Sequence, residues 1–152
     1  MSPDSESNQT EDRAEERRWI GRQHEIVVNY LAAQGCEHGG VATWPAFHLL
    51  DPYVALWAVQ STATPGKIGW WAISGDLPTD YMSSSSGYHP RDALRHFSRQ
   101  WADVAAHMRA GKEHPETKIG GPDLWPTMAP ILESRAELLQ DCAEDDEMWE
   151  GF

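Results

Sequence analysis

The sequence predicts an α+β domain, with a small antiparallel sheet built on a central hairpin and covered by about three helices. Two apolar, aromatic-rich segments, residues 53–60 and 68–74, flank a Pro–Gly turn, which is typical of a hairpin. Apolar residues recur at steps of three and four both before and after these segments, as in amphipathic helices. A hairpin is marginal by itself, so we expect the helices to cover it.

The first helix is predicted to start near Arg13. Residues 1–12 are polar and acidic, and we expect them to form a disordered lead-in. Gly35 supplies a plausible helix stop. The apolar face of this helix carries Trp19, Ile20, Ile26, Val27, Tyr30 and Leu31.

The strand segment 53–60 is apolar on both faces, which favours a buried strand. Pro65–Gly66 suits a type II turn, and residues 68–74 return as the second strand. A further short strand is predicted at residues 47–50. Trp70 and Trp71 are adjacent, so in a strand their side chains face opposite ways, and the outward one is a candidate contact surface.

Two more helices follow the hairpin. The first begins at His89–Pro90–Arg91 and ends at Gly111, and we expect Phe97 and Trp101 on its apolar stripe to be core residues. The last helix is predicted to become regular at Pro130 and to run to about Cys142. Residues 144–152 form an acidic tail that opposes the helix dipole and is expected to fray. Residues 13–143 then form one α+β domain.

The charge balance excludes several classes of protein. Twenty-four acidic residues against twelve basic ones give a net charge of −12, which disfavours binding to nucleic acid or to anionic lipid. The sequence shows neither a secretory signal nor an apolar run of membrane-spanning length, so a cytoplasmic protein is expected. The negative electrostatic field of such a protein attracts basic partners. The alternative is that the acidic residues only keep the protein soluble.

The segment "GDLPTDY", residues 75–81, has two readings that the sequence leaves open. Asp76, Asp80 and Tyr81, together with His89, offer carboxylates and an imidazole for acid–base chemistry. The same residues also suit a strand exit and a turn. None of the common hydrolase, kinase, P-loop or zinc-peptidase motifs occurs, which favours a protein without catalytic activity.

Neither a metal nor a cofactor is predicted. Cys36 and His38 lack a companion pair at a zinc-like spacing. His96 and His107 share one helix but lie about 16 Å apart along it by the helical rise, too far for one ion. Arg91, Arg95 and Arg99 form a basic stripe that either pairs with acids of the same chain or anchors an acidic ligand.

Several segments together resemble a bacterial domain family of unknown function. They are "ALWAVQSTATPGKIGWWAISGDLPTDYM", "HPRDALRHFSRQW", "KIGGPDLWPTMAPILESRAELL" and "AEDDEMW". Shared features are a W-x-I-S-G-D-L-P-T-D-Y run, an H-P-R helix start and an acidic tail with a tryptophan. The resemblance covers about residues 13–149 and implies no activity.

Two functions from different classes remain. The first is a cytoplasmic protein-binding module, most concretely an immunity or antitoxin-type protein that neutralises a toxic partner enzyme with a basic face. The second is a small hydrolase or transferase that uses the region of Asp76, Asp80, Tyr81 and His89. The sequence leaves the oligomeric state open. The predicted binding residues are Trp71, Asp76, Asp80, Tyr81, Arg91, Asp145, Asp146 and Trp149.

Overall fold

The computed structural model describes residues 3–50, 53–115 and 121–151. Its contacts divide the chain into two compact units, Met1–Ser84 and Ser85–Phe152. We call them the sheet unit and the helical unit and describe each by itself. Helices and an antiparallel sheet confirm the predicted α+β class.

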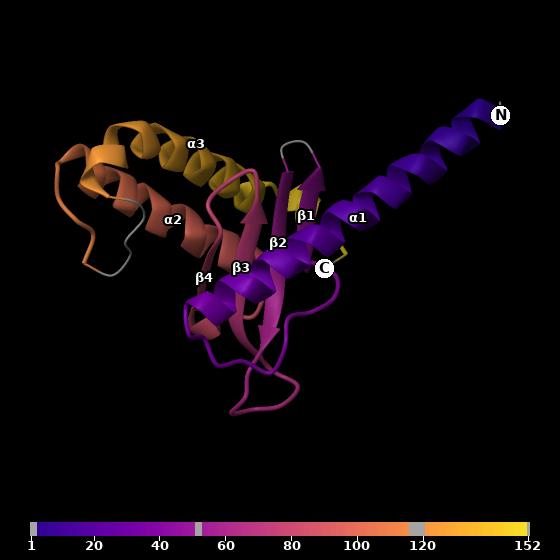
Figure 1. The fold of residues 1–152 in the computed structure, drawn as a ribbon, viewed down its shortest axis with the longest axis horizontal. Coiled ribbons are helices and arrows are strands. Elements are labelled where there is room, and N and C mark those ends of the chain that lie inside the picture. The colour runs from indigo at the N-terminus through magenta and orange to yellow at the C-terminus, as the bar shows by residue number, and fades with distance from the viewer. Residues whose placement is uncertain (1–2, 51–52, 116–120, 152) are drawn as a thin grey trace. The chain divides into compact units, whose positions relative to one another are not determined.

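The sheet unit is a four-stranded antiparallel meander in the order β1-β2-β3-β4 (Figure 1). In the central pair, Trp57 of β2 lies opposite Ala72 of β3, as the predicted hairpin requires. The strands extend over Phe47–Leu50 (β1), Tyr53–Gln60 (β2), Ile68–Gly75 (β3) and Asp80–Ser83 (β4).

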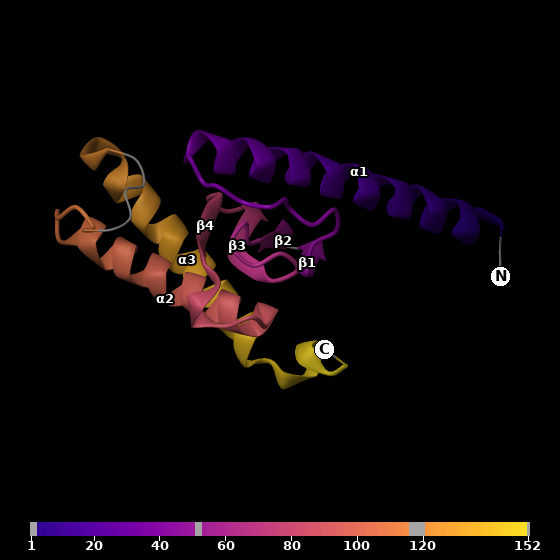
Figure 2. The same ribbon diagram turned by 90° about the horizontal axis from the view of Figure 1, so that it is seen from below.

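The long helix α1, Pro3–Ala33, lies along one face of this sheet (Figure 2). The strands turn alternate side chains toward the helix because neighbouring strand residues face opposite ways. The indole Nε1–H of Trp57 donates to Ser74 Oγ at 3.1 Å, which satisfies the polar atom of a fully buried ring. The core between helix and sheet consists of Ile20, Val27, Leu31, Ala55, Trp57, Val59 and Ala72.

Two features of the sheet unit differ from the sequence predictions. The described part of the expected disordered lead-in, from Pro3 on, belongs to α1. Its composition explains this, since a proline in the first turn and acids near the N-terminus both suit a helix start. The second difference is β4, since the sequence analysis considered a strand exit and a turn at residues 75–81 but no further strand there. Its residues pair with β3, for example Tyr81 with Ala72, so the edge of β3 supplies hydrogen bonds that local sequence does not reveal.

Gly75 and Gly21 are expected to respond in opposite ways to alanine. Gly75 has φ +129, and an added Cβ would lie 2.4 Å from the Tyr53 carbonyl oxygen, whereas Gly21 lies in α1 with nothing within 4 Å. Gly75→Ala should lower the free energy of unfolding by about 2–3 kcal/mol through clash and backbone strain. Gly21→Ala should raise it by about 1 kcal/mol, since alanine is the better helix former. Urea unfolding followed by circular dichroism measures both, and equal effects of the two substitutions would contradict the geometry at Gly75.

The helical unit pairs α2, Pro90–Arg109, with α3, Trp125–Glu144, as adjacent antiparallel helices (Figures 1 and 2). Short 3-10 turns precede and follow α3, at Pro122–Leu124 (η2) and Asp146–Trp149 (η3); a third, η1, covers Ser84–Ser86. Ser98 of α2 donates its buried hydroxyl to the Ala136 carbonyl of α3 at 2.7 Å. The predicted stripe of α2 is buried, with Phe97 at 1% and Trp101 at 0% exposure.

The start of α3 differs from the prediction that regular helix begins at Pro130. The helix begins five residues earlier, at Trp125, and contains Pro130. Pro126 in the first turn explains the early start, because the missing N–H of a proline costs nothing there. Among the described residues, no helix has the length and apolar character needed to cross a membrane.

Candidate functional site

The segment at Asp76–Tyr81 forms the exit of β3 and the start of β4. The main-chain N–H of Asp76 donates to the Tyr53 carbonyl at 2.8 Å. Asp80 Oδ1 accepts a hydrogen bond from the main-chain N–H of Tyr81, also at 2.8 Å. The first contact ties the exit of β3 to β2, and the second lies at the start of β4, so both hold this segment against the sheet.

Tyr81 belongs to an aromatic group beside Asp80. Its ring lies 5.9 Å from the rings of both Tyr30 and Trp70. Burial raises the pKa of Tyr30 to about 12, and the charge of Asp80 adds to the shift. Tyr30 therefore remains a neutral phenol at ordinary pH, which suits packing better than acid–base work.

His89, the fourth candidate for chemistry, lies in the helical unit, where it caps α2. Its Nδ1 accepts a hydrogen bond from the main-chain N–H of Arg91 at 3.0 Å. Its ring lies 5.6 Å from that of Trp149 in an edge-on arrangement. This imidazole thus has a structural role at a helix start.

Four residues join the start of α2 to the end of the chain, and we call them the C-terminal clasp: His89, Arg91, Asp146 and Trp149. Arg91 donates through Nε to the Ala143 carbonyl and through a terminal nitrogen to Asp146 at 2.6 Å. The indole N–H of Trp149 donates to the Cys142 carbonyl at 2.9 Å. A guanidinium at the carboxyl end of α3 also offsets the helix dipole there.

The clasp changes the interpretation of the acidic tail. Instead of fraying, residues after α3 form η3, with Asp145 Oδ1 accepting from the Glu147 main-chain N–H at 3.1 Å. Trp149 is only 7% exposed and Trp71 only 1%, so neither ring offers much surface to a partner, contrary to their prediction as binding residues. Arg91 pairs with an acid of its own chain, which is one of the two predicted alternatives.

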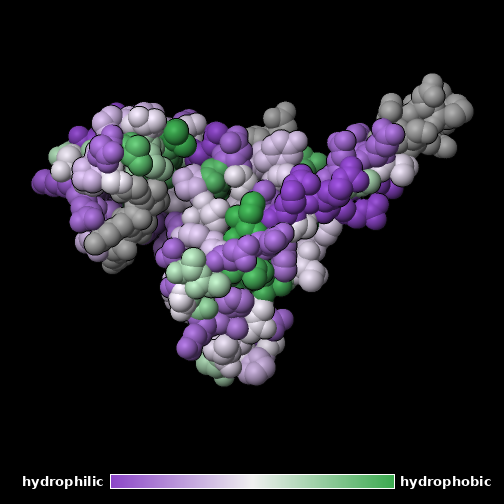
Figure 3. Space-filling model, viewed as in Figure 1, coloured by the Kyte–Doolittle hydropathy of each residue, from purple (hydrophilic) through white to green (hydrophobic). Residues whose placement is uncertain are grey.

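A groove that the sequence analysis missed lies in the sheet unit, between α1 and the adjoining ends of β1 and β2, at Leu50 and Tyr53. Its volume is about 520 Å³. Figure 3 shows that the coloured surface of α1 next to its grey N-terminal end is mostly hydrophilic. We call this groove the acidic–aromatic groove. Its lining residues are Asp12, Glu15, Glu16, Arg18, Trp19, Arg22, Leu50 and Tyr53.

The groove places acids beside exposed apolar surface. Trp19 and Tyr53 pack with ring centroids 5.2 Å apart, and Tyr53 and Leu50 remain 48% and 41% exposed. Glu16 is held by His48 Nε2 at 2.7 Å. The helical spacing of Glu15, Glu16 and Trp19 puts them on one face, a signal that the sequence contained. Their meeting with Tyr53 depends on how α1 packs on the sheet.

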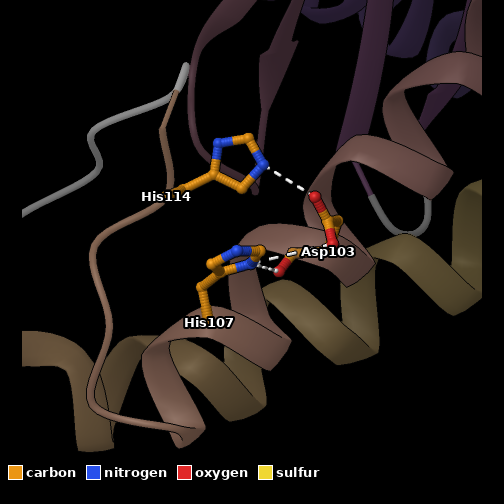
Figure 4. Close-up of side chains that lie close together, drawn as sticks. All are labelled: Asp103, His107 and His114. Atoms are coloured by element: carbon orange, nitrogen blue, oxygen red, sulfur yellow. Dashed lines mark hydrogen bonds and ion pairs between the residues drawn. The ribbon is translucent and has the colours of Figure 1, made fainter.

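A second group of polar residues missed by the sequence analysis lies at the end of α2, and we call it the Asp–His–His cluster: Asp103, His107 and His114. Each offers one ligand atom, and these atoms lie within 4.8 Å of one another. His107 follows Asp103 by one helical turn, and His114 approaches from the segment after α2 (Figure 4). Only the Asp103–His107 spacing is visible in the sequence.

The fold and these sites define the protein as a small α+β protein with an acidic surface groove and a polar cluster at a helix end. Residues 13–149 match the family model described as "Domain of unknown function (DUF4826)", and the chain belongs to this family. This agrees with the resemblance noted from the sequence. Neither the curated proteins nor the solved structures contain a match to the chain.

Proposed function

We propose that this protein is a protein-binding module for a basic partner, and more concretely an immunity or antitoxin-type protein of the bacterial cytoplasm that neutralises a toxic enzyme. The acidic–aromatic groove carries this proposal, because it combines carboxylates with exposed aromatic and aliphatic surface. Protein-binding sites are enriched in such aromatic residues.

The groove suits an arginine or lysine side chain of the partner. Asp12 and Glu15 provide carboxylates for an ion pair, and Trp19 and Tyr53 provide ring surface for the stem and the cation. Arg18 and Arg22 line the same groove and disfavour a purely basic segment. The partner segment we expect is therefore mixed, with a basic residue that meets the acids and apolar residues that meet Leu50 and Tyr53.

The net charge of −12 supports the same partner chemistry. Opposite net charges accelerate the encounter of two proteins, and this acceleration falls with ionic strength. Fast association suits a protein that neutralises a toxic enzyme, because it must bind the enzyme before the enzyme acts.

The test uses the product of the neighbouring reading frame as partner. If that product is toxic, co-expression with this protein should restore growth. In purified form, the double variant Asp12→Lys/Glu15→Lys should slow association about 10-fold or more and flatten its salt dependence, because charges at the edge of an interface act mainly on encounter. Stopped-flow measurements at several salt concentrations give both quantities.

A matched charge reversal provides the control. Glu137 and Asp141 are exposed residues of α3, outside the groove. Glu137→Lys/Asp141→Lys changes the net charge equally, so it should slow association far less than the groove variant. Equal effects of the two double variants would mean that only net charge matters and would refute the groove as the binding site.

The alternative function, a small hydrolase or transferase, gains no support from the contacts of its candidate residues. Asp80 accepts a main-chain hydrogen bond at the start of β4, Tyr81 packs against two rings, and His89 caps a helix. No observation favours this function over the binding module.

A further inference from the structure

The Asp–His–His cluster brings together three metal-ligating side chains from two neighbouring segments of the helical unit. His114 Nε2 lies 2.7 Å from Asp103 Oδ2, and the rings of His107 and His114 have centroids 4.8 Å apart (Figure 4). The His114 side chain is 5% exposed, His107 is 32% exposed and Asp103 is 58% exposed. The cluster thus has one deeply buried member and one side open to solvent.

A hydrogen bond between the ring of His107 and the main chain fixes the tautomer of His107. Its Nδ1 lies 2.8 Å from the main-chain carbonyl oxygen of Asp103, and a carbonyl can only accept, so Nδ1 carries the proton. The lone pair of the neutral ring is then on Nε2. Histidines that bind metals commonly use this arrangement, with one nitrogen donating to a carbonyl and the other left for the ion.

We propose that Asp103, His107 and His114 form a Zn²⁺ site. Two imidazole nitrogens and one carboxylate oxygen match the ligands that zinc uses in three-ligand sites, where water takes the fourth position. Calcium and magnesium prefer all-oxygen sites, so they fit this set poorly. The exposed side of Asp103, which also lines a cavity of about 500 Å³ with His96, Arg99 and Gln100, leaves room for that water.

Binding of the ion replaces hydrogen bonds within the cluster by metal bonds. In the metal-free pair, the Nε2 proton of His114 lies against the Asp103 carboxylate. Zn²⁺ takes the place of this proton. The proton leaves Nε2 while Nδ1 takes one up from solvent, so the ring stays neutral, and Nε2 and the carboxylate oxygen both bind the ion. The bound ion ties the segment after α2 to the last turns of that helix.

The proposal is tested by titrating the untagged full-length chain, stripped with chelator, with ZnCl₂ in a calorimeter. We expect one ion per chain and a melting temperature that rises with Zn²⁺ concentration, because the ion binds the folded state. MgCl₂ at the same concentrations should leave the melting temperature unchanged. His107→Ala, His114→Ala and Asp103→Asn should each weaken zinc binding by at least about 10-fold.

The matched control is His48→Ala, which removes an imidazole from the other described histidine–carboxylate pair at 2.7 Å, with Glu16. It should leave the zinc affinity within about twofold, because a pair without a third ligand makes a poor zinc site. Far-UV circular dichroism establishes that each variant is folded. The proposal is overturned if the wild-type chain binds no zinc, if the three cluster variants bind it as tightly as wild type, or if His48→Ala weakens binding equally. Because the titration uses no protein partner, its failure leaves the proposed binding function standing.

Discussion

Trp101→Ala is expected to lower the free energy of unfolding by about 3–5 kcal/mol, the usual cost of removing a buried aromatic side chain. The ring has 0% exposure and packs against Phe97 with centroids 5.8 Å apart. Close-packed surroundings relax only partly around such a cavity, so the lost contacts add to the lost burial. Urea unfolding followed by far-UV circular dichroism gives the free energy.

Trp44→Ala is the matched control for this substitution. Trp44 is 50% exposed and makes an edge-on contact with His48. The same chemical change should therefore cost less than about 1 kcal/mol. If Trp101→Ala cost no more than Trp44→Ala, the apolar stripe of α2 could not be the core of the helical unit.

Trp149→Ala should be the next most damaging substitution, with a loss of about 2–4 kcal/mol. The substitution removes a ring that is 7% exposed, its contact with His89 and its hydrogen bond to the Cys142 carbonyl. Trp149→Phe keeps an aromatic ring but lacks the donor, so it should lose only about 1 kcal/mol from the hydrogen bond. Thermal and urea unfolding measure both changes.

The exposed ion pair of the C-terminal clasp should matter much less than the tryptophan. The Asp146 side chain is 87% exposed, so Asp146→Asn should cost under about 1 kcal/mol. Hydrogen exchange of residues 145–151 should speed up in Trp149→Ala and hardly change in Asp146→Asn. A Trp149→Ala variant that kept full stability but lost its partner would restore the sequence-based view of Trp149 as a binding residue.

The sequence predicted the repetitive parts of the fold because burial follows the period of each element. Residues 53–60 and 68–74 are strands, and Phe97 and Trp101 are buried, as alternation and helical spacing indicated. β4 escaped prediction because its four residues gain their structure from the edge of β3. The early start of α3 escaped because Pro130 was taken as a boundary, while Pro126 in the first turn was enough.

The candidate sites depended far more on tertiary structure. The predicted residues Asp80, Tyr81, His89 and Arg91 carry side chains suited to chemistry. Their contacts are nevertheless those of a strand start, a ring cluster, a helix cap and the C-terminal clasp. Composition identifies such residues but does not say which polar atoms already have partners within the chain.

The sequence by itself determined the α+β class, the core stripes and the acidity, since each follows from composition or from local spacing. Only the tertiary structure decided that Trp19 meets Tyr53 in a groove and that His114 meets Asp103 at the end of α2. Both meetings join residues from different segments, and their geometry is set by how the intervening chain packs. The physical reason is that periodicity reports the direction in which a side chain points, whereas a site requires the positions of several side chains relative to one another.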